Sequence, residues 1–262
     1  MNLSKLGILL YGSLIYVIFL LTFLYCIGFV AGFAVPTTLD EMGREPATFA
    51  QALTVNVSLL GLFAVQHMIM ARRWFKKRWT RIIHPAMERS TFVLVTCAIL
   101  IAMFLRWEAM PTIVWEIQNQ TLRIVVYSLA GLGWAGVLVS TFLIDHFELF
   151  GLKQVIRHFR GVDAKGSPFL VRSFYKYTRH PLYLSFFIAF WCAPTMTVGH
   201  LVFALLCTGF VLIAVNLEER DLVAEHGDNY RQYRRDVPKL LPSLSAGGRH
   251  STTVPSALPS AR

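Results

Sequence analysis

The sequence predicts an all-α, polytopic integral membrane protein: a helical bundle of four membrane spans followed by a C-terminal helical hairpin, with five to six transmembrane helices in total. Composition is the first observation behind this fold class. Of the 262 residues, 55% are hydrophobic and only 15% are charged, whereas about a quarter of the residues of a typical soluble domain are charged. We therefore exclude a water-soluble fold, and we do not expect nucleic-acid binding to explain the net charge of +10.

The arrangement of the charges is the second observation. Uncharged runs cover residues 6–39, 46–71, 90–105, 124–144 and 181–217. A membrane-spanning helix needs about 20 mainly apolar residues. The first four runs therefore predict one span each, with the crossing of the short run 90–105 left open.

The charges between the runs predict an orientation. Segment 71–89 carries seven basic residues and one acidic residue, and segment 148–180 carries seven basic and two acidic residues. The alternate segments, 34–50 and 106–122, have net charges of −2 and −1. Because Lys and Arg accumulate in cytoplasmic loops, we expect both basic segments on the cytoplasmic side of the inner membrane. Both termini lie there too if the chain crosses six times.

The last uncharged run predicts the hairpin. Its 37 residues would make one helix about 55 Å long, far longer than the roughly 30 Å core of a bilayer. Pro194, Gly199 and His200 mark a bend within it. We expect a tight helical hairpin whose tip can stop short of the far side, and five spans if one arm does not cross.

Polar residues at the borders of the apolar runs are the candidate functional residues, because they are costly to keep in a membrane. The predicted topology places four such clusters on the cytoplasmic side: Gln66-His67, Asp145-His146-Phe-Glu148, Arg179-His180-Pro181-Leu-Tyr183 and Asn216-Leu-Glu218-Glu219-Arg220. Closure of the hairpin brings the third cluster to the fourth. Their charges then form either a structural ion pair or a site for a zwitterion such as S-adenosylmethionine or an amino acid.

The end of the chain resembles a known family. Arg179-His-Pro-Leu-Tyr183, the apolar hairpin, Glu218-Glu219, Gly227-x-x-Tyr230-x-x-Tyr233 and Val237-Pro238 are similar to the C-terminal signature of the isoprenylcysteine carboxyl methyltransferase and phospholipid methyltransferase superfamily. The match covers roughly residues 175–242. Stretches that begin at Gln66, Pro85 and Phe147 resemble bacterial methanethiol S-methyltransferases and the related proteins named for nitric-oxide-responsive operons.

The resemblance implies an integral-membrane enzyme that binds S-adenosylmethionine at the cytoplasmic face and, in the closest branch, methylates a small thiol, methanethiol, to dimethyl sulfide. Residues 1–242 would form the methyltransferase domain, and the Ser-, Gly- and Pro-rich residues 243–262 a disordered cytoplasmic tail. The cofactor-binding residues that it implies are Arg179, His180, Pro181, Tyr183, Glu218, Glu219, Tyr230 and Tyr233. Gln154 either reaches the cofactor or lies on a solvated interfacial helix.

Methyl transfer to a thiol favours the thiolate, so a general base would help. The candidates are His146 and His180, since an unperturbed histidine pKa near 6.5 suits proton acceptance at neutral pH. Each has an alternative: His146 is oriented by Asp145 or anchors its helix, and His180 contacts the cofactor or caps the helix that begins at Pro181. We expect His67 and Asp145 to line the substrate pocket, with packing as the alternative for His67.

Other functions stay open at this point. The acceptor is alternatively a prenyl-cysteine carboxylate or a lipid amine, and the chain is alternatively a non-enzymatic membrane accessory protein. The complete Arg-His-Pro-x-Tyr and Glu-Glu motifs count against the accessory role. We expect membrane lipid as a partner and no metal, because no two of the eight histidines are spaced i,i+4. The sequence does not predict an oligomeric state.

Overall fold

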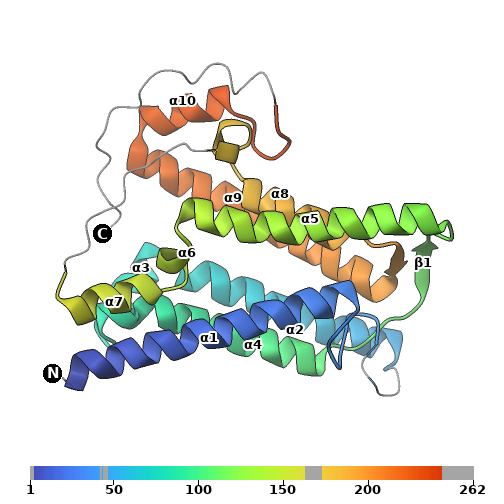
Figure 1. The fold of residues 1–262 in the computed structure, drawn as a ribbon, viewed down its shortest axis with the longest axis horizontal. Helices are drawn as coiled ribbons and strands as arrows, with labels where there is room; N and C mark the ends of the chain where they lie inside the picture. The colour runs from blue at the N-terminus through green and yellow to red at the C-terminus, as the bar shows by residue number, and fades with distance from the viewer. Residues whose placement is uncertain (1–2, 42, 44–46, 163–172, 244–262) are drawn as a thin grey trace.

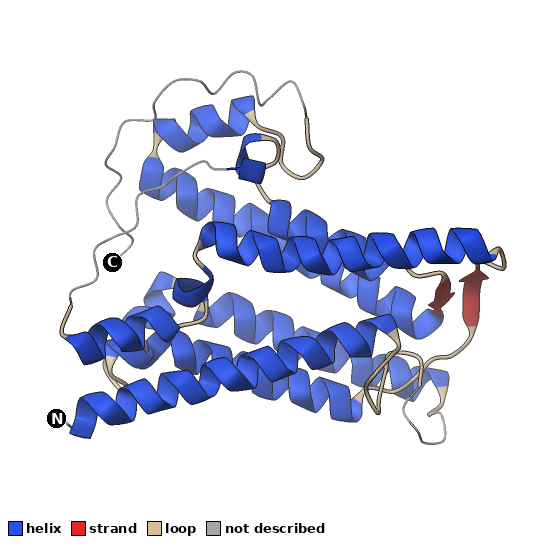
Figure 2. Cartoon of the chain, viewed as in Figure 1, coloured by secondary structure: helices blue, strands red, loops and turns tan. Residues whose placement is uncertain are grey.

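The computed structural model of the chain describes residues 3–41, 43, 47–162 and 173–243, in which helices dominate (Figures 1 and 2). The helices are α1 (Leu3–Ala31), α2 (Phe49–Met70), α3 (Arg73–Trp79), α4 (Glu88–Arg106), α5 (Gln120–Ile144), α6 (His146–Leu149), α7 (Leu152–Arg160), α8 (Pro181–Trp191), α9 (Val198–His226) and α10 (Asp228–Asp236). Short 3-10 turns cover Pro85–Met87 (η1) and Ser173–Lys176 (η2), and two strands cover Ile113–Glu116 (β1) and Thr195–Thr197 (β2). The predicted tail, from residue 244 on, lies outside the described residues.

Five helices of the described chain are long and apolar enough to cross a membrane: α1, α2, α4 with the turn before it, α5 and α9. These helices confirm the all-α, polytopic membrane fold. The short uncharged run 90–105 lies in α4 and is thus part of a candidate span. The first arm of the hairpin, α8, has only 11 residues. At 1.5 Å per residue it is about 16 Å long, half the thickness of a bilayer core. The hairpin is therefore asymmetric, with one half-length and one full-length arm.

The tip of the hairpin is an extended segment and not a simple helical turn. Strand β2 pairs antiparallel with β1, which lies between α4 and α5. Just before β2, the carbonyl of Pro194 accepts a hydrogen bond from the Ile117 amide at 2.9 Å, and the carbonyl of Ala193 accepts one from the Trp115 indole at 3.2 Å. The bend at Pro194 is thus where we expect it, and extended chain covers the distance that α8 does not.

The chain runs back and forth between two ends of the bundle (Figure 1). We call the end that carries α3, α6, α7 and α10 the basic end, and the end that carries β1 and β2 the sheet end. The described parts of both basic segments, 71–89 and 148–180, lie at the basic end. Six passes bring the start of α1 and the end of α9 to this same end.

Two layers of helices make the bundle: α1, α2 and α4 form one, and α5, α8 and α9 the other (Figure 2). A shared core joins them through Phe29, Trp107, Trp134, Phe190 and Phe203. Trp107 is fully buried, and its indole N–H donates to the Leu39 carbonyl at 3.1 Å. Buried indole groups need such a partner, so this bond fixes the loop after α1 against the core.

Helices α5 and α8 pack unusually closely because glycines line the contact. A Cβ atom on Gly133 would lie 2.6 Å from the backbone nitrogen of Ala189, and one on Gly136 would lie 2.5 Å from the hydroxyl oxygen of Ser185. Small residues let membrane helices approach to backbone contact. Gly133 and Gly136 therefore serve helix packing, and they hold the short helix α8 in place.

We predict that Gly133→Ala destabilises the protein by about 1–3 kcal/mol, because the added methyl group overlaps the α8 backbone. Gly131→Ala is the matched control on the same helix, since a Cβ there meets nothing within 4 Å. Thermal unfolding in detergent measures both variants. Equal melting temperatures for the two variants would show that α5 and α8 do not depend on this contact.

Candidate functional site

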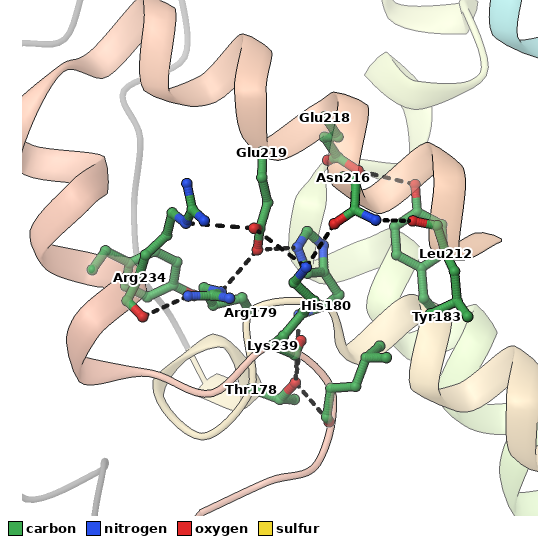
Figure 3. A network of polar contacts seen from close by, with 12 residues as sticks. Thr178, Arg179, His180, Tyr183, Leu212, Asn216, Glu218, Glu219, Arg234 and Lys239 are labelled. Atoms are coloured by element: carbon green, nitrogen blue, oxygen red, sulfur yellow. Dashed lines mark hydrogen bonds and ion pairs between the residues drawn. The ribbon is translucent and has the colours of Figure 1, made fainter.

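The hairpin brings its predicted clusters together at the basic end, as Figure 3 shows. The residues before α8 meet the last turns of α9, and His180 Nε2 lies 3.1 Å from Glu219 Oε1. Helix α10 and residues 237–240 close over this contact from the other side. The predicted juxtaposition of Arg179 and His180 with the Glu218-Glu219 pair is therefore present in the structure.

Glu219 is the centre of the cluster. It is only 2% exposed, and four cationic or potentially cationic side chains surround its carboxylate. Oε1 lies 3.0 Å from Arg179 Nε and 3.1 Å from His180 Nε2, and Oε2 lies 3.5 Å from Arg234 Nε and 3.8 Å from Lys239 Nζ. A buried carboxylate is tolerated only with such compensation, so Glu219 is held inside the protein.

Arg179 is bound by the chain that follows the hairpin. Its side chain is 7% exposed, its Nη1 donates to the Arg234 carbonyl at 2.6 Å, and its backbone amide donates to the Pro238 carbonyl at 2.9 Å. Nε faces Glu219 as an ion pair without hydrogen-bond alignment. Thr178 adds a hydroxyl hydrogen bond to the Leu240 carbonyl at 2.9 Å. Arg179 thus locks α10 and residues 237–240 onto Glu219.

Glu218 has a different environment from its neighbour. It is exposed, and its Oε2 accepts a hydrogen bond from the Tyr183 hydroxyl at 3.0 Å. The two carboxylates of the motif therefore face different partners: Glu219 the buried cations, and Glu218 the tyrosine of α8 and the space outside. Glu218 is the carboxylate of this pair that a ligand can reach.

His180 donates its Nε2 hydrogen to Glu219, because a carboxylate can only accept. Burial lowers the pKa of His180, and the negative charges of Glu218 and Glu219 oppose this shift. Pro181 follows it as the first residue of α8, the helical position in which the missing N–H of proline costs nothing. His180 therefore both begins the helix and supports the buried carboxylate.

Tyr230 and Tyr233 attach α10 to the cluster. Both are buried, their rings pack 5.7 Å apart, and Leu222 and Val223 of α9 lie against them. The Tyr233 hydroxyl donates to the Tyr175 carbonyl at 2.8 Å. Burial, together with the charge of Glu219, raises the pKa of Tyr230. The two tyrosines therefore pack α10 against α9 and the residues before α8, and their contact with a cofactor remains a prediction.

His146 forms a second polar cluster at the junction of α5 and α6. The Thr141 hydroxyl donates to the Leu138 carbonyl at 2.7 Å, so it accepts from His146 Nδ1, 2.8 Å away. Neutral His146 then presents the lone pair of Nε2 to the Tyr16 hydroxyl, at 2.9 Å. Phe142 stacks on the ring with centroids 4.3 Å apart. Burial lowers the pKa of His146, against an opposing effect of Asp145.

Asp145 turns away from this histidine. Its backbone has a φ of +144°, and its carboxylate accepts from the Glu148 amide at 3.1 Å and pairs with Lys153. It therefore caps α6, whose first free N–H groups need an acceptor. The expected contact of Asp145 with a substrate remains a prediction.

Gln154 and His67 lie apart from the Glu219 cluster. Gln154 is on α7 and donates to the Glu148 carbonyl at 2.9 Å, while its Oε1 is buried without a partner among the described residues. The His67 ring packs against Phe63, Phe92 and Phe210, and its buried Nδ1 likewise has no partner in the described chain. His67 thus occupies an apolar space between α2, α4 and α9.

The structure adds residues that the sequence predictions missed. Arg234 and Lys239 contact Glu219, and Tyr16 contacts His146 across 130 positions of sequence. Arg234 follows Tyr230 by four residues, so helical spacing alone could have placed it on the same face. Nothing in the sequence connects Tyr16 to His146.

Comparison with known proteins places these residues in a family. Residues 33–237 match a family described as "Protein of unknown function (DUF1295)". The chain is 47% identical to methanethiol S-methyltransferase of Mycobacterium tuberculosis, over 89% of this chain and 95% of the relative. It is 48% identical to methanethiol S-methyltransferase of Crocosphaera subtropica, over 92% and 94% of the two chains. The chain belongs to the methanethiol S-methyltransferase family.

More distant similarity extends beyond the methanethiol S-methyltransferases. Nurim of Rattus norvegicus is 30% identical over 65% of this chain and 68% of its own. No solved structure matches the chain. The family match includes His146 and the whole Arg179-to-Glu219 hairpin but neither Tyr16 nor Lys239.

We predict that Glu219→Gln destabilises the protein by about 3–5 kcal/mol, because it leaves Arg179 buried without its counter-charge. Glu218→Gln is the matched control and costs at most about 1 kcal/mol, since Glu218 is exposed. Chemical unfolding in detergent measures the difference. Similar unfolding midpoints would contradict the central role of Glu219.

Proposed function

We propose that this membrane protein transfers the methyl group of S-adenosylmethionine to methanethiol and releases dimethyl sulfide. The observation that carries the proposal is the similarity, at 44–48% identity, to six methanethiol S-methyltransferases along 89–94% of the chain. Such similarity over nearly the full length favours this acceptor over a prenyl-cysteine carboxylate or a lipid amine. It also disfavours the accessory role.

The chemistry of the cluster fits S-adenosylmethionine. The cofactor carries an ammonium group and ribose hydroxyls, all of which donate hydrogen bonds, and the exposed Glu218 carboxylate beside the Tyr183 hydroxyl accepts them. His180 and Pro181 fix the start of α8, so that Tyr183 stays at this carboxylate. We assign Glu218 and Tyr183 to cofactor contact, and Arg179, Glu219, Tyr230 and Tyr233 to holding that contact in place. Gln154 on α7 stays a prediction for the same site.

When bound, the cofactor supplies an activated methyl group on a sulfonium sulfur. The protein must orient the thiol and take up its proton. In-line displacement needs the nucleophile held about 3–3.5 Å from the methyl carbon, and the phenylalanine rings around His67 offer an apolar environment of the kind that suits a small thiol. A new S–C bond then forms on the thiol sulfur as the sulfonium S–C bond breaks.

His146 is the better placed general base. Its Nε2 lone pair accepts only a hydroxyl hydrogen bond, from Tyr16, which a thiol can replace, whereas Nε2 of His180 is held by the buried Glu219 carboxylate. Because α5 and α8 run antiparallel and meet at Gly136 and Ser185, the end of α5 that leads to His146 lies beside the start of α8. We propose that Nε2 accepts the thiol proton in place of the Tyr16 hydroxyl.

The orientation in the membrane is part of the proposal. The basic end carries the two segments with net charges of +6 and +5, and cytoplasmic loops are rich in Lys and Arg. We place this end, and with it the cofactor site, in the cytoplasm, and the sheet end on the far side of the inner membrane.

Purified protein given S-adenosylmethionine and methanethiol is expected to release dimethyl sulfide, measured by gas chromatography. Glu218→Ala is expected to weaken binding of S-adenosylhomocysteine by about tenfold, measured by calorimetry, because it removes a charged acceptor. Glu116→Ala, a carboxylate at the sheet end, is the control and should leave the affinity unchanged.

The outcomes separate substrate from cofactor. Binding of S-adenosylhomocysteine without dimethyl sulfide would discard methanethiol as the acceptor, and prenyl-cysteine and lipid-amine acceptors would then be tested in the same preparation. Absence of both binding and product would favour the non-enzymatic accessory role.

His146→Gln is expected to lower kcat/KM at pH 7 by about 100-fold or more, the usual contribution of a general base. In the wild type, kcat/KM should fall as the pH is lowered and His146 becomes protonated. This fall should begin only below about pH 6.5, the ordinary histidine pKa, because burial lowers the pKa of His146. Rates measured from pH 5 to 8 check both statements. His158→Gln at the same end is the control, and an unchanged acid limb in His146→Gln would exclude His146 as the base.

A further inference from the structure

A hollow lies beside the Glu219 cluster on the side of α10. Its volume is about 370 Å³, and the residues of the described chain that line it are all arginines: Arg179, Arg231, Arg234 and Arg235. Arg179 forms the floor with a side chain only 7% exposed, and the other three are exposed on α10. Four guanidinium groups around one space repel one another unless an anion compensates them.

The described carboxylates do not balance these charges. Glu219 pairs with Arg179 and Arg234 but is shared with Lys239 and His180. Asp228 pairs with Arg231 at 2.7 Å. Asp236, which follows Arg235 in sequence, accepts instead from the Gln232 amide. Four arginines therefore share two paired carboxylates, and the hollow retains an excess of positive charge.

The guanidinium groups indicate the class of anion. Arginine binds phosphate through two parallel N–H donors, and several arginines around one space suit a group with several acceptor oxygens. A carboxylate has only two oxygens, which the two parallel N–H donors of a single arginine can satisfy. The lining therefore favours a phosphate group.

The position of the hollow indicates where the phosphate comes from. Glu219 lies two residues, about 3 Å along the helix, beyond the last residue of the uncharged run 181–217. This level is the border between the apolar part of the bundle and its basic end, where lipid headgroups lie around a membrane protein.

Exposed apolar side chains on the segments that adjoin α10 support a lipid. Phe174, Tyr177 and Leu241 are 52%, 37% and 76% exposed. Their segments meet α10 and each other through the hydrogen bonds from Tyr233 to the Tyr175 carbonyl and from the Ser243 amide to the Tyr177 carbonyl. Exposed apolar and aromatic residues beside a cationic site are what an amphiphile with an anionic headgroup requires.

We propose that the arginine hollow binds the phosphate group of an anionic membrane phospholipid, with the acyl chains over Phe174, Tyr177 and Leu241. The site is separate from the proposed cofactor contact. Glu218 and Tyr183 lie on the other side of Glu219 and His180 from Arg234 (Figure 3). The bound lipid neutralises the arginines and holds α10 over the buried carboxylate.

The test uses delipidated full-length protein in detergent, and native mass spectrometry to count bound molecules. Three probes are titrated: dilauroylphosphatidylglycerol, inorganic phosphate, and dilauroylglycerol, which has the same chains without the phosphate. The double variant Arg231→Gln/Arg235→Gln is expected to weaken binding of the phospholipid by about tenfold or more, because two phosphate donors are lost. Arg220→Gln is the matched control, an exposed arginine of α9 outside the lining, and should change the affinity by no more than about twofold.

The remaining arms decide the source of the anion. Leu241→Ser should weaken binding of the phospholipid, and dilauroylglycerol should bind poorly. Equal binding of the phospholipid by wild type and double variant would overturn the proposal. So would displacement of the phospholipid by equimolar inorganic phosphate, which would assign the hollow to a soluble anion. Displacement by S-adenosylhomocysteine, with loss of its affinity in the double variant, would assign the hollow to the cofactor carboxylate instead.

Discussion

The basic end of this protein depends on one buried carboxylate. Glu219 is almost inaccessible to solvent, yet it lies where four segments meet: the residues before α8, the end of α9, helix α10 and residues 237–240. The residues before α8, helix α10 and residues 237–240 each supply a positive charge or a donor to it. Because a buried ion pair is costly to leave incomplete, the carboxylate forces these segments into one arrangement. The Arg-His-Pro-x-Tyr and Glu-Glu motifs are the sequence form of this arrangement: Glu219 is buried among the cations, and Glu218 is exposed and accepts from the Tyr183 hydroxyl.

The short helix α8 serves the same arrangement. A full-length first arm would carry Arg179 and His180 well past the end of the neighbouring spans, whereas an 11-residue helix begins at the level of Glu219. Contact of α8 with the glycine face of α5 fixes its depth, and extended chain through Pro194 to β2 completes the distance to the sheet end. Arg179 and His180 thus reach the border of the apolar region on the inside of the bundle, where the Glu219 carboxylate pairs with them.

Much of this could be predicted from the sequence because it follows from lengths. A run of 37 uncharged residues is too long for one crossing, so the hairpin and the meeting of Arg179 and His180 with the glutamates follow from bilayer thickness. Bilayer thickness does not predict that Glu219 is buried and Glu218 exposed. That difference depends on which side of α9 the neighbouring elements occupy. Strand pairing at the hairpin tip and the Tyr16–His146 contact join residues far apart in sequence, with no periodicity to reveal them. The sequence likewise does not reveal that the Asp145 carboxylate caps α6, since this depends on the backbone turn at Asp145.

Arg179 donates hydrogen bonds to the carbonyls of Pro238 and Arg234. Because these two residues follow the hairpin in sequence, the basic end can form only after the hairpin has been synthesised. Helix α8 is too short to span a bilayer by itself, so it must insert together with α9. Glu219 lies on α9 and is therefore synthesised before Arg234 of α10, which later contacts its carboxylate. Residues 234–238 must therefore leave the ribosome before Arg179 can be closed in. Chains truncated ahead of Pro238 would carry all five long apolar helices of the described chain and still lack the contacts that complete the basic end.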